Sequence, residues 1–260
     1  MILLYLAVAA FYAGAAWLRS RGDPHGPLPA ILVVVAVALH GVALVYAVWT
    51  PEGLDLSFLH ALSLVAWLTV IVAGASGVVR QLPMAGNVIL PVAALCALAP
   101  LAGGSAHRFP YASEPWATAH IAIALIAYAA FVVAALQALL LTSIEKRLHR
   151  GLAPAGEATL PLLTLERFLF RLVGIGFVLL TLTLISGFLF SEQMFGRAVT
   201  LNHKNVFSLA GWLTFAILLA GRWRYGWRGR RALVWILAGT SLLVLGYLGS
   251  KFVAEVLLGR

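Results

Sequence analysis

The sequence is poor in charge and in cysteine, and both shortages exclude classes of function. Only 10% of the 260 residues are charged, 62% are hydrophobic, and the mean hydropathy is +0.98. This composition is typical of an integral membrane protein and excludes an ordinary soluble domain. The single cysteine, Cys96, lies in an apolar segment, so neither an internal disulfide nor a CxxC redox pair can form.

Common catalytic motifs are also missing from the sequence. It contains no phosphate-binding loop, no HExxH, no nucleophile elbow and no pair of carboxylates inside an apolar run. We therefore expect a binding or assembly factor rather than an enzyme. The net charge of +9 predicts no nucleic-acid partner, because the basic residues stand at the ends of apolar segments, where orientation in the bilayer explains them.

The sequence is rich in apolar segments long enough to cross a bilayer, which takes about 20 helical residues. Together they predict an all-α integral membrane protein, a bundle of about eight transmembrane helices that forms one domain over 1–260. The segments fall near 2–18, 28–49, 57–79, 86–101, 115–142, 165–190, 205–221 and 231–257.

The basic residues predict the orientation of this bundle. Thirteen of the 18 follow the first, third, fifth or seventh segment. Since cytoplasmic loops carry the excess of Lys and Arg, these connections are predicted to be cytoplasmic and both termini to lie outside. Arg19 and Arg21 follow the first segment and no basic residue precedes it, the reverse of a cleavable signal peptide.

The fifth segment, 115–142, carries an imidazole inside an apolar run. His120 lies about 7 Å below the predicted outer end of the helix at the usual helical rise. Such a group needs a hydrogen-bond partner or a metal, because the hydrocarbon offers no water. The segment is also lined with small residues that let neighbouring backbones approach, which predicts a central helix; these are Ala117, Ala124, Ala127, Ala130, Ala134, Ala135 and Ala138.

Two further histidines fall in the outer half or near the midplane. His60 is one turn into the third segment, at nearly the depth of His120, and His40 is in the middle of the second. Imidazoles that face each other across a bundle can ligate haem iron, so His120 with His60 or His40 predicts a haem b site in the outer half. The alternative is that each histidine makes an ordinary hydrogen bond between helices.

Cations at the same end complete the list of candidates. Lys251 stands four residues before Glu255, which predicts an ion pair on one helix face. Alternatively, Lys251 and Arg108 bind carboxylates such as haem propionates. His203, just before the seventh segment, lies at the same end and is the remaining candidate for cofactor binding.

Three stretches resemble the cytochrome c assembly (CcsA-type) family of haem-handling membrane proteins and lie in the family's order within 115–250. The first is WATAHI at 116–121; the second is LERFLFRLVGIGFVLLTLTLISG at 165–187; the third comprises WLTFAILLAGR at 212–222, GWRG at 226–229 and GYLG at 246–249.

This resemblance implies haem handling in the bacterial inner membrane, in support of cytochrome c maturation or haem trafficking. His120 matches a haem ligand of the family. The loop 190–203 has no tryptophan, so the chain resembles the small HemX/YpjD-type branch, which lacks the family's Trp-rich motif. An alternative function is a cofactor-free scaffold whose basic loops, 146–171 and 222–231, contact a partner such as a haem-biosynthesis enzyme.

Overall fold

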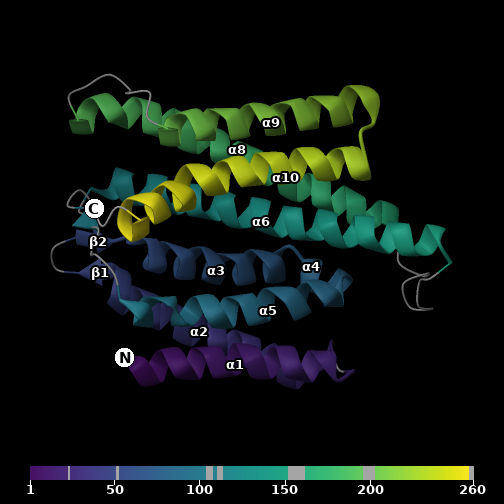
Figure 1. Cartoon of the computed structure of the whole chain (residues 1–260), viewed down its shortest axis with the longest axis horizontal. Coiled ribbons are helices and arrows are strands. Elements are labelled where there is room, and N and C mark those ends of the chain that lie inside the picture. The colour runs from purple at the N-terminus through teal and green to yellow at the C-terminus, as the bar shows by residue number, and fades with distance from the viewer. Residues whose placement is uncertain are drawn as a thin grey trace.

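The computed structural model confirms the all-α architecture: eight helices are long and apolar enough to cross a membrane. It describes residues 1–22, 24–50, 53–103, 108–109, 114–151, 162–195 and 203–257. Figure 1 shows the long helices running side by side along one axis, as a membrane bundle requires.

The first half of the chain forms four of the spans, because apolar runs are separated by short breaks. Proline opens α2 and α5, where its missing N–H costs no hydrogen bond. Gly77, at φ 73°, turns the chain after α3. The elements are α1 (Ile2–Ser20), α2 (Pro27–Val48), α3 (Phe58–Ala75), α4 (Val78–Gln81), α5 (Pro83–Leu98) and the 3-10 turn η1 (Ala99–Ala102).

The second half supplies four longer spans. The elements are α6 (Pro115–His149), α8 (Leu162–Phe195), α9 (His203–Tyr225), α10 (Arg230–Val244) and the π-helical turns η3 (Leu245–Gly249) and η4 (Phe252–Leu257). Three of the spans, α6, α8 and α9, extend several residues past the predicted apolar windows, since polar and basic residues continue a helix readily where it leaves the hydrocarbon.

Helix α6 is central, as its alanines predict. It packs against α8, α3 and α10, and 56% of its most apolar window is buried, the largest share of the eight spans. Small residues allow this packing: a Cβ added at Gly176 of α8 would lie 3.0 Å from the Phe131 ring of α6. Phe131 also stacks on Phe215 of α9 with ring centroids 3.8 Å apart.

Three short strands form a small antiparallel sheet in the order β1-β2-β3, which the sequence did not predict. They are β1 (Trp49–Thr50), β2 (Gly53–Asp55) and β3 (Arg108–Phe109). Figure 1 shows β1, β2 and both chain ends at the same end of the bundle. We call this the sheet end, and the opposite end, which carries residues 222–231, the basic end. That the sheet end faces outward stays a prediction from the charges.

Candidate functional site

His120 lies at the sheet end of the central helix α6 and faces α8. Its Nδ1 is 2.8 Å from Oγ of Ser186. Ser186 Oγ is also 3.1 Å from the carbonyl oxygen of Thr183, a group that only accepts hydrogen bonds. The serine hydroxyl has one proton, so both contacts are hydrogen bonds at once only if Ser186 donates to the Thr183 carbonyl oxygen.

The direction of these bonds determines the tautomer of the imidazole. Since Ser186 donates to Thr183, it accepts at its oxygen, and His120 donates from Nδ1. A neutral imidazole then carries its lone pair on Nε2, the form that binds a metal. Metal-ligating histidines are commonly oriented in this way by a hydrogen bond to the second ring nitrogen.

Gly187 provides the room for this ring. A Cβ added at Gly187 would lie 3.1 Å from Cε1 of His120, tighter than ordinary van der Waals contact. This glycine of α8 therefore makes room for the imidazole, as Gly176 of the same helix does for the Phe131 ring.

His40 lies in a different environment, fully buried among α1, α2 and α3. Its Nε2 is 2.9 Å from Ser63 Oγ, and its Nδ1 is 3.4 Å from the Tyr12 hydroxyl, whose ring it meets edge-on. Both ring nitrogens are engaged, so iron ligation by His40 would require one of these bonds to break. The geometry is that of a hydrogen bond between helices, the alternative to a ligand role for this histidine.

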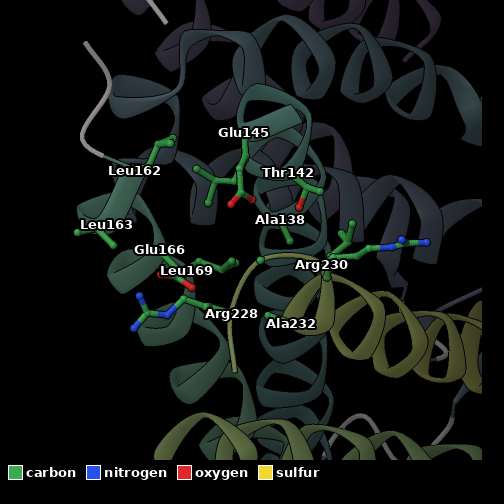
Figure 2. A pocket seen from close by; sticks show the side chains of 13 residues that line it. Ala138, Thr142, Glu145, Leu162, Leu163, Glu166, Leu169, Arg228, Arg230 and Ala232 are labelled. Carbon is green, nitrogen blue, oxygen red and sulfur yellow. The ribbon is translucent and has the colours of Figure 1, made fainter. Parts of the chain in front are cut away.

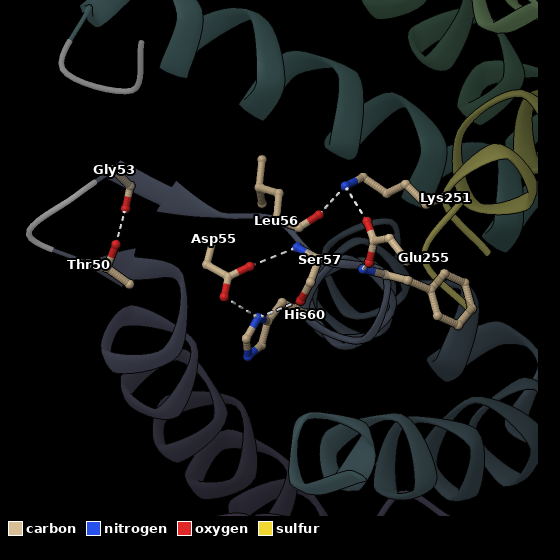
Figure 3. Close-up of polar contacts among 9 residues, drawn as sticks. Thr50, Gly53, Asp55, Leu56, Ser57, His60, Lys251 and Glu255 are labelled. Atoms are coloured by element: carbon tan, nitrogen blue, oxygen red, sulfur yellow. Dashed lines mark hydrogen bonds and ion pairs between the residues drawn. The ribbon is translucent and has the colours of Figure 1, made fainter. Parts of the chain in front are cut away.

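His60 is held by its own helix start and by β2, as Figure 3 shows. Its Nδ1 is 2.8 Å from Ser57 Oγ and 3.4 Å from Asp55 Oδ2. The other ring nitrogen points away from both groups in Figure 3. His60 lines a cavity of about 140 Å³ with Pro100 and Gly103, smaller than the pockets that enclose a drug-sized ligand, which run from roughly 300 Å³ upwards.

In the described residues His120 and His60 meet different neighbours rather than each other. Ile121, next to His120, packs on the apolar cluster that contains Leu54 and Leu56 of the β2 segment. His120 itself turns to α8, whereas His60 turns to the cavity beside η1. Equal depth on two packed helices therefore did not make the two imidazoles face one another. The described part of the chain also has no group of three or more His, Cys, Asp or Glu arranged for a metal ion.

Lys251 forms the predicted ion pair with Glu255, at 3.4 Å. The structure adds two bonds that join the last helix to the start of α3 (Figure 3). Lys251 Nζ donates to the carbonyl oxygen of Leu56, and Glu255 Oε2 accepts from the backbone N–H of Phe58 at 2.5 Å. We call these contacts the C-terminal latch. A role for Lys251 toward a propionate stays a prediction.

The sequence did not predict the latch, because its partners are 195 and 197 residues apart in the chain. The spacing of Lys251 and Glu255 predicted their mutual pair and nothing about α3. Two other candidates, Arg108 and His203, belong to β3 and to the first position of α9. Their side chains lie outside the described residues, so their roles also stay predictions.

Comparisons with known proteins identify the family. The chain is 33% identical over 235 residues to "Inner membrane protein YpjD" of Escherichia coli (strain K12), covering 87% of this chain and 86% of that protein. It is 25% identical over 301 residues to "Cytochrome c biogenesis protein CcsA" of Thermosynechococcus vestitus, covering 97% and 92%. No solved structure matches the chain.

The family match extends well beyond the three stretches noted in the sequence. It covers residues 3–258 and so includes the first four spans as well as the helix that carries His120. The resemblance seen in the second half of the chain is thereby confirmed: this chain belongs to the Cytochrome C assembly protein family.

Proposed function

We propose that this protein handles haem in the bacterial inner membrane, in support of cytochrome c maturation or haem trafficking, and binds the iron of haem b through Nε2 of His120. The family and the CcsA relatives support a role in cytochrome c maturation. The relative named an inner membrane protein supports the location. Haem itself and a protein of cytochrome c maturation or haem biosynthesis are the partners that this function implies.

One observation carries the assignment to His120. The chain of hydrogen bonds from Nδ1 through Ser186 to Thr183 leaves the lone pair on Nε2. No hydrogen bond to Nε2 is found among the described residues. Bound haem would supply an iron centre that can exchange electrons, and its potential would depend on the axial ligands and on burial.

The second axial ligand in this proposal comes from His60 or His40, and their surroundings differ. Among the described residues no hydrogen bond engages Nε2 of His60, whereas His40 would have to give up Tyr12 or Ser63. Joining His120 and His60 on one iron requires a rearrangement of the sheet end, because their present neighbours are different.

The experiment is absorption spectroscopy of protein purified from cells supplied with a haem precursor. We expect a Soret band and a stable haem content in the parent protein, and loss of both in His120→Ala. His149→Ala is the matched control: it lies on the same helix at the basic end, is exposed, and bonds only the backbone oxygen of Glu145 in the described residues. A colourless parent that also takes up no added haemin would refute the proposal.

The second candidate function, a cofactor-free scaffold, is favoured by the engaged nitrogens of His40, which make at least that histidine a packing residue. Its contacts would come from the basic connections at 146–171 and 222–231. Charge reversal at Arg228 and Arg230, both exposed, would then abolish function while His120→Ala leaves it intact. The opposite pattern supports haem binding.

A further inference from the structure

The surroundings of the histidines differ in what they offer to a second axial ligand. The largest cavity of the described residues has a volume of about 520 Å³ and lies at the basic end, between α6, α8 and the start of α10 (Figure 2). None of the side chains that line it in this part of the chain is a histidine. This cavity therefore supplies no second ligand, and the choice stays between His60 and His40.

His60 belongs to a short polar group at the start of α3, which Figure 3 shows. Asp55, Ser57 and His60 stand within six residues of the chain. Asp55 Oδ1 accepts a hydrogen bond from the backbone N–H of Ser57 at 3.0 Å, which fixes the carboxylate. Its other oxygen, Oδ2, lies 3.4 Å from Nδ1 of His60. Asp55 is 8% exposed, so little water screens its charge from the imidazole.

Ser57 departs from the usual role of a serine at its position. It is the N-cap residue of α3, where a serine side chain commonly accepts a hydrogen bond from an N–H of the first turn. Ser57 makes no such cap bond. Its Oγ lies 2.8 Å from Nδ1 of His60 instead. The start of α3 thus gives up a cap bond, and the imidazole gains a fixed orientation.

The carboxylate determines which ring nitrogen of His60 carries the proton. A hydroxyl can donate or accept, so Ser57 alone is compatible with both tautomers, whereas an ionised carboxylate only accepts. A lone pair on Nδ1 would be repelled by Oδ2 of Asp55, while an N–H there is attracted by both oxygens. The neutral imidazole therefore keeps its proton on Nδ1 and its lone pair on Nε2, the form that ligates a metal.

His40 lacks this support. Its ring nitrogens contact the hydroxyls of Tyr12 and Ser63, which lie on two other helices. Among the described residues no carboxylate forms an ion pair with it. The group around His60 is local in sequence, so Asp55 and Ser57 move together with the ring when the sheet end rearranges. The orientation of the His60 imidazole is then kept.

We propose that Asp55 is a positioning residue that makes His60, rather than His40, the second axial ligand of the haem iron. This inference rests on the proposed function and decides between its two alternatives. A carboxylate that accepts from Nδ1–H makes the imidazole a more basic ligand, and its negative charge favours the ferric over the ferrous state. Asp55 therefore lowers the reduction potential of the bound haem.

The test variant is Asp55→Asn. Its side-chain oxygen still accepts from the N–H of Ser57, but its amide nitrogen then faces Nδ1 of His60 as a donor and moves the proton to Nε2. We expect ferric haem to lose about tenfold more affinity than ferrous haem, which raises the reduction potential by about 59 mV in a spectroelectrochemical titration of haem-loaded protein. Glu114→Gln is the matched control, because Glu114 is an exposed carboxylate at the sheet end of α6. It should keep the parent potential.

Nitrogen-15 NMR of haem-free protein labelled in its histidines measures the tautomer directly, and His60→Gln assigns the resonance. We expect Nδ1–H in the parent and in Glu114→Gln, and Nε2–H in Asp55→Asn. The parent spectrum decides the tautomer even where Asp55→Asn fails to fold.

Two results would overturn this inference alone: Nε2–H at His60 in the parent, or an Asp55→Asn potential equal to that of Glu114→Gln. Either can occur while a Soret band that depends on His120 supports the proposed function. A parent protein that takes up no haem refutes the proposed function, and the ligand role of His60 with it.

Discussion

The C-terminal latch makes a prediction whose size follows from burial. The side chains of Lys251 and Glu255 are both buried, with 3% and 6% of their surface exposed. Removing one partner of a buried ion pair costs about 3–5 kcal/mol, because the other charge stays buried without its counter-ion. In Glu255→Ala, Lys251 loses its carboxylate and Phe58 loses the acceptor of its N–H. We therefore expect Glu255→Ala to lose about 3–5 kcal/mol of stability.

Thermal unfolding in detergent, followed by near-UV circular dichroism, measures this loss. At about 2–4 °C per kcal/mol for a chain of this size, the melting temperature should fall on the order of 10 °C. The double variant Glu255→Ala with Lys251→Met should recover most of the loss, since it removes both charges. Glu114→Ala is the control: it is an exposed N-cap of α6 that makes no side-chain cap bond, and its effect should stay within about 0.5 kcal/mol. If Glu255→Ala melts with the parent protein, or if the double variant is no better than the single one, the latch does not hold the C-terminal helix to α3.

Three further predictions concern the imidazoles and one close contact. Ser186→Ala should weaken haemin binding about 10–100-fold in a Soret titration, because the hydrogen bond that orients the imidazole of His120 is lost. An unchanged affinity would contradict the assignment of the proton to Nδ1 of His120. His40→Leu should lower the stability by about 1–3 kcal/mol in the same melting assay, since the buried hydroxyls of Tyr12 and Ser63 lose their partner. The Soret band should remain. A lost or shifted band would instead assign His40 as a ligand of the iron. Gly86→Ala should destabilise the protein by about 1–3 kcal/mol through overpacking. Its Cβ would lie 2.8 Å from Nε of buried Arg19, and this side chain cannot move away without losing its hydrogen bonds to the carbonyl oxygens of Pro24, Val79 and Pro83. Gly174→Ala, with nothing within 4 Å, should be neutral or slightly stabilising. Equal melting temperatures for the two variants would contradict the contact.

Much of the fold follows from sequence because the signals are local. A run of about 20 apolar residues must be helical in a bilayer, since every backbone group has to be satisfied within the segment. The eight spans follow from this rule and are confirmed. The central position of α6 follows from its alanines, because small side chains matter only where helices approach closely. The family is also recognisable from three short stretches.

Helix ends and the small sheet were less accessible. Helix α6 continues to His149 rather than ending near 142, because basic residues continue a helix once it leaves the hydrocarbon. Strands of two or three residues carry no alternation to detect. The pairing of β2 with β3 also joins segments more than fifty residues apart in the chain, such as Asp55 and Arg108.

By itself, then, the sequence determined the class of protein, the number of spans and the one imidazole, His120, in the most closely packed helix. The depth of a residue along its helix also follows from the local sequence, so the sequence predicts His120 and His60 at nearly the same level of the bundle. Only the tertiary structure decided which way each ring faces and which nitrogen stays open. That depends on the rotation of each helix and on partners such as Ser186 on α8, Tyr12 on α1 and Ser63 on α3. Such contacts join residues tens of positions apart, and no local pattern specifies them.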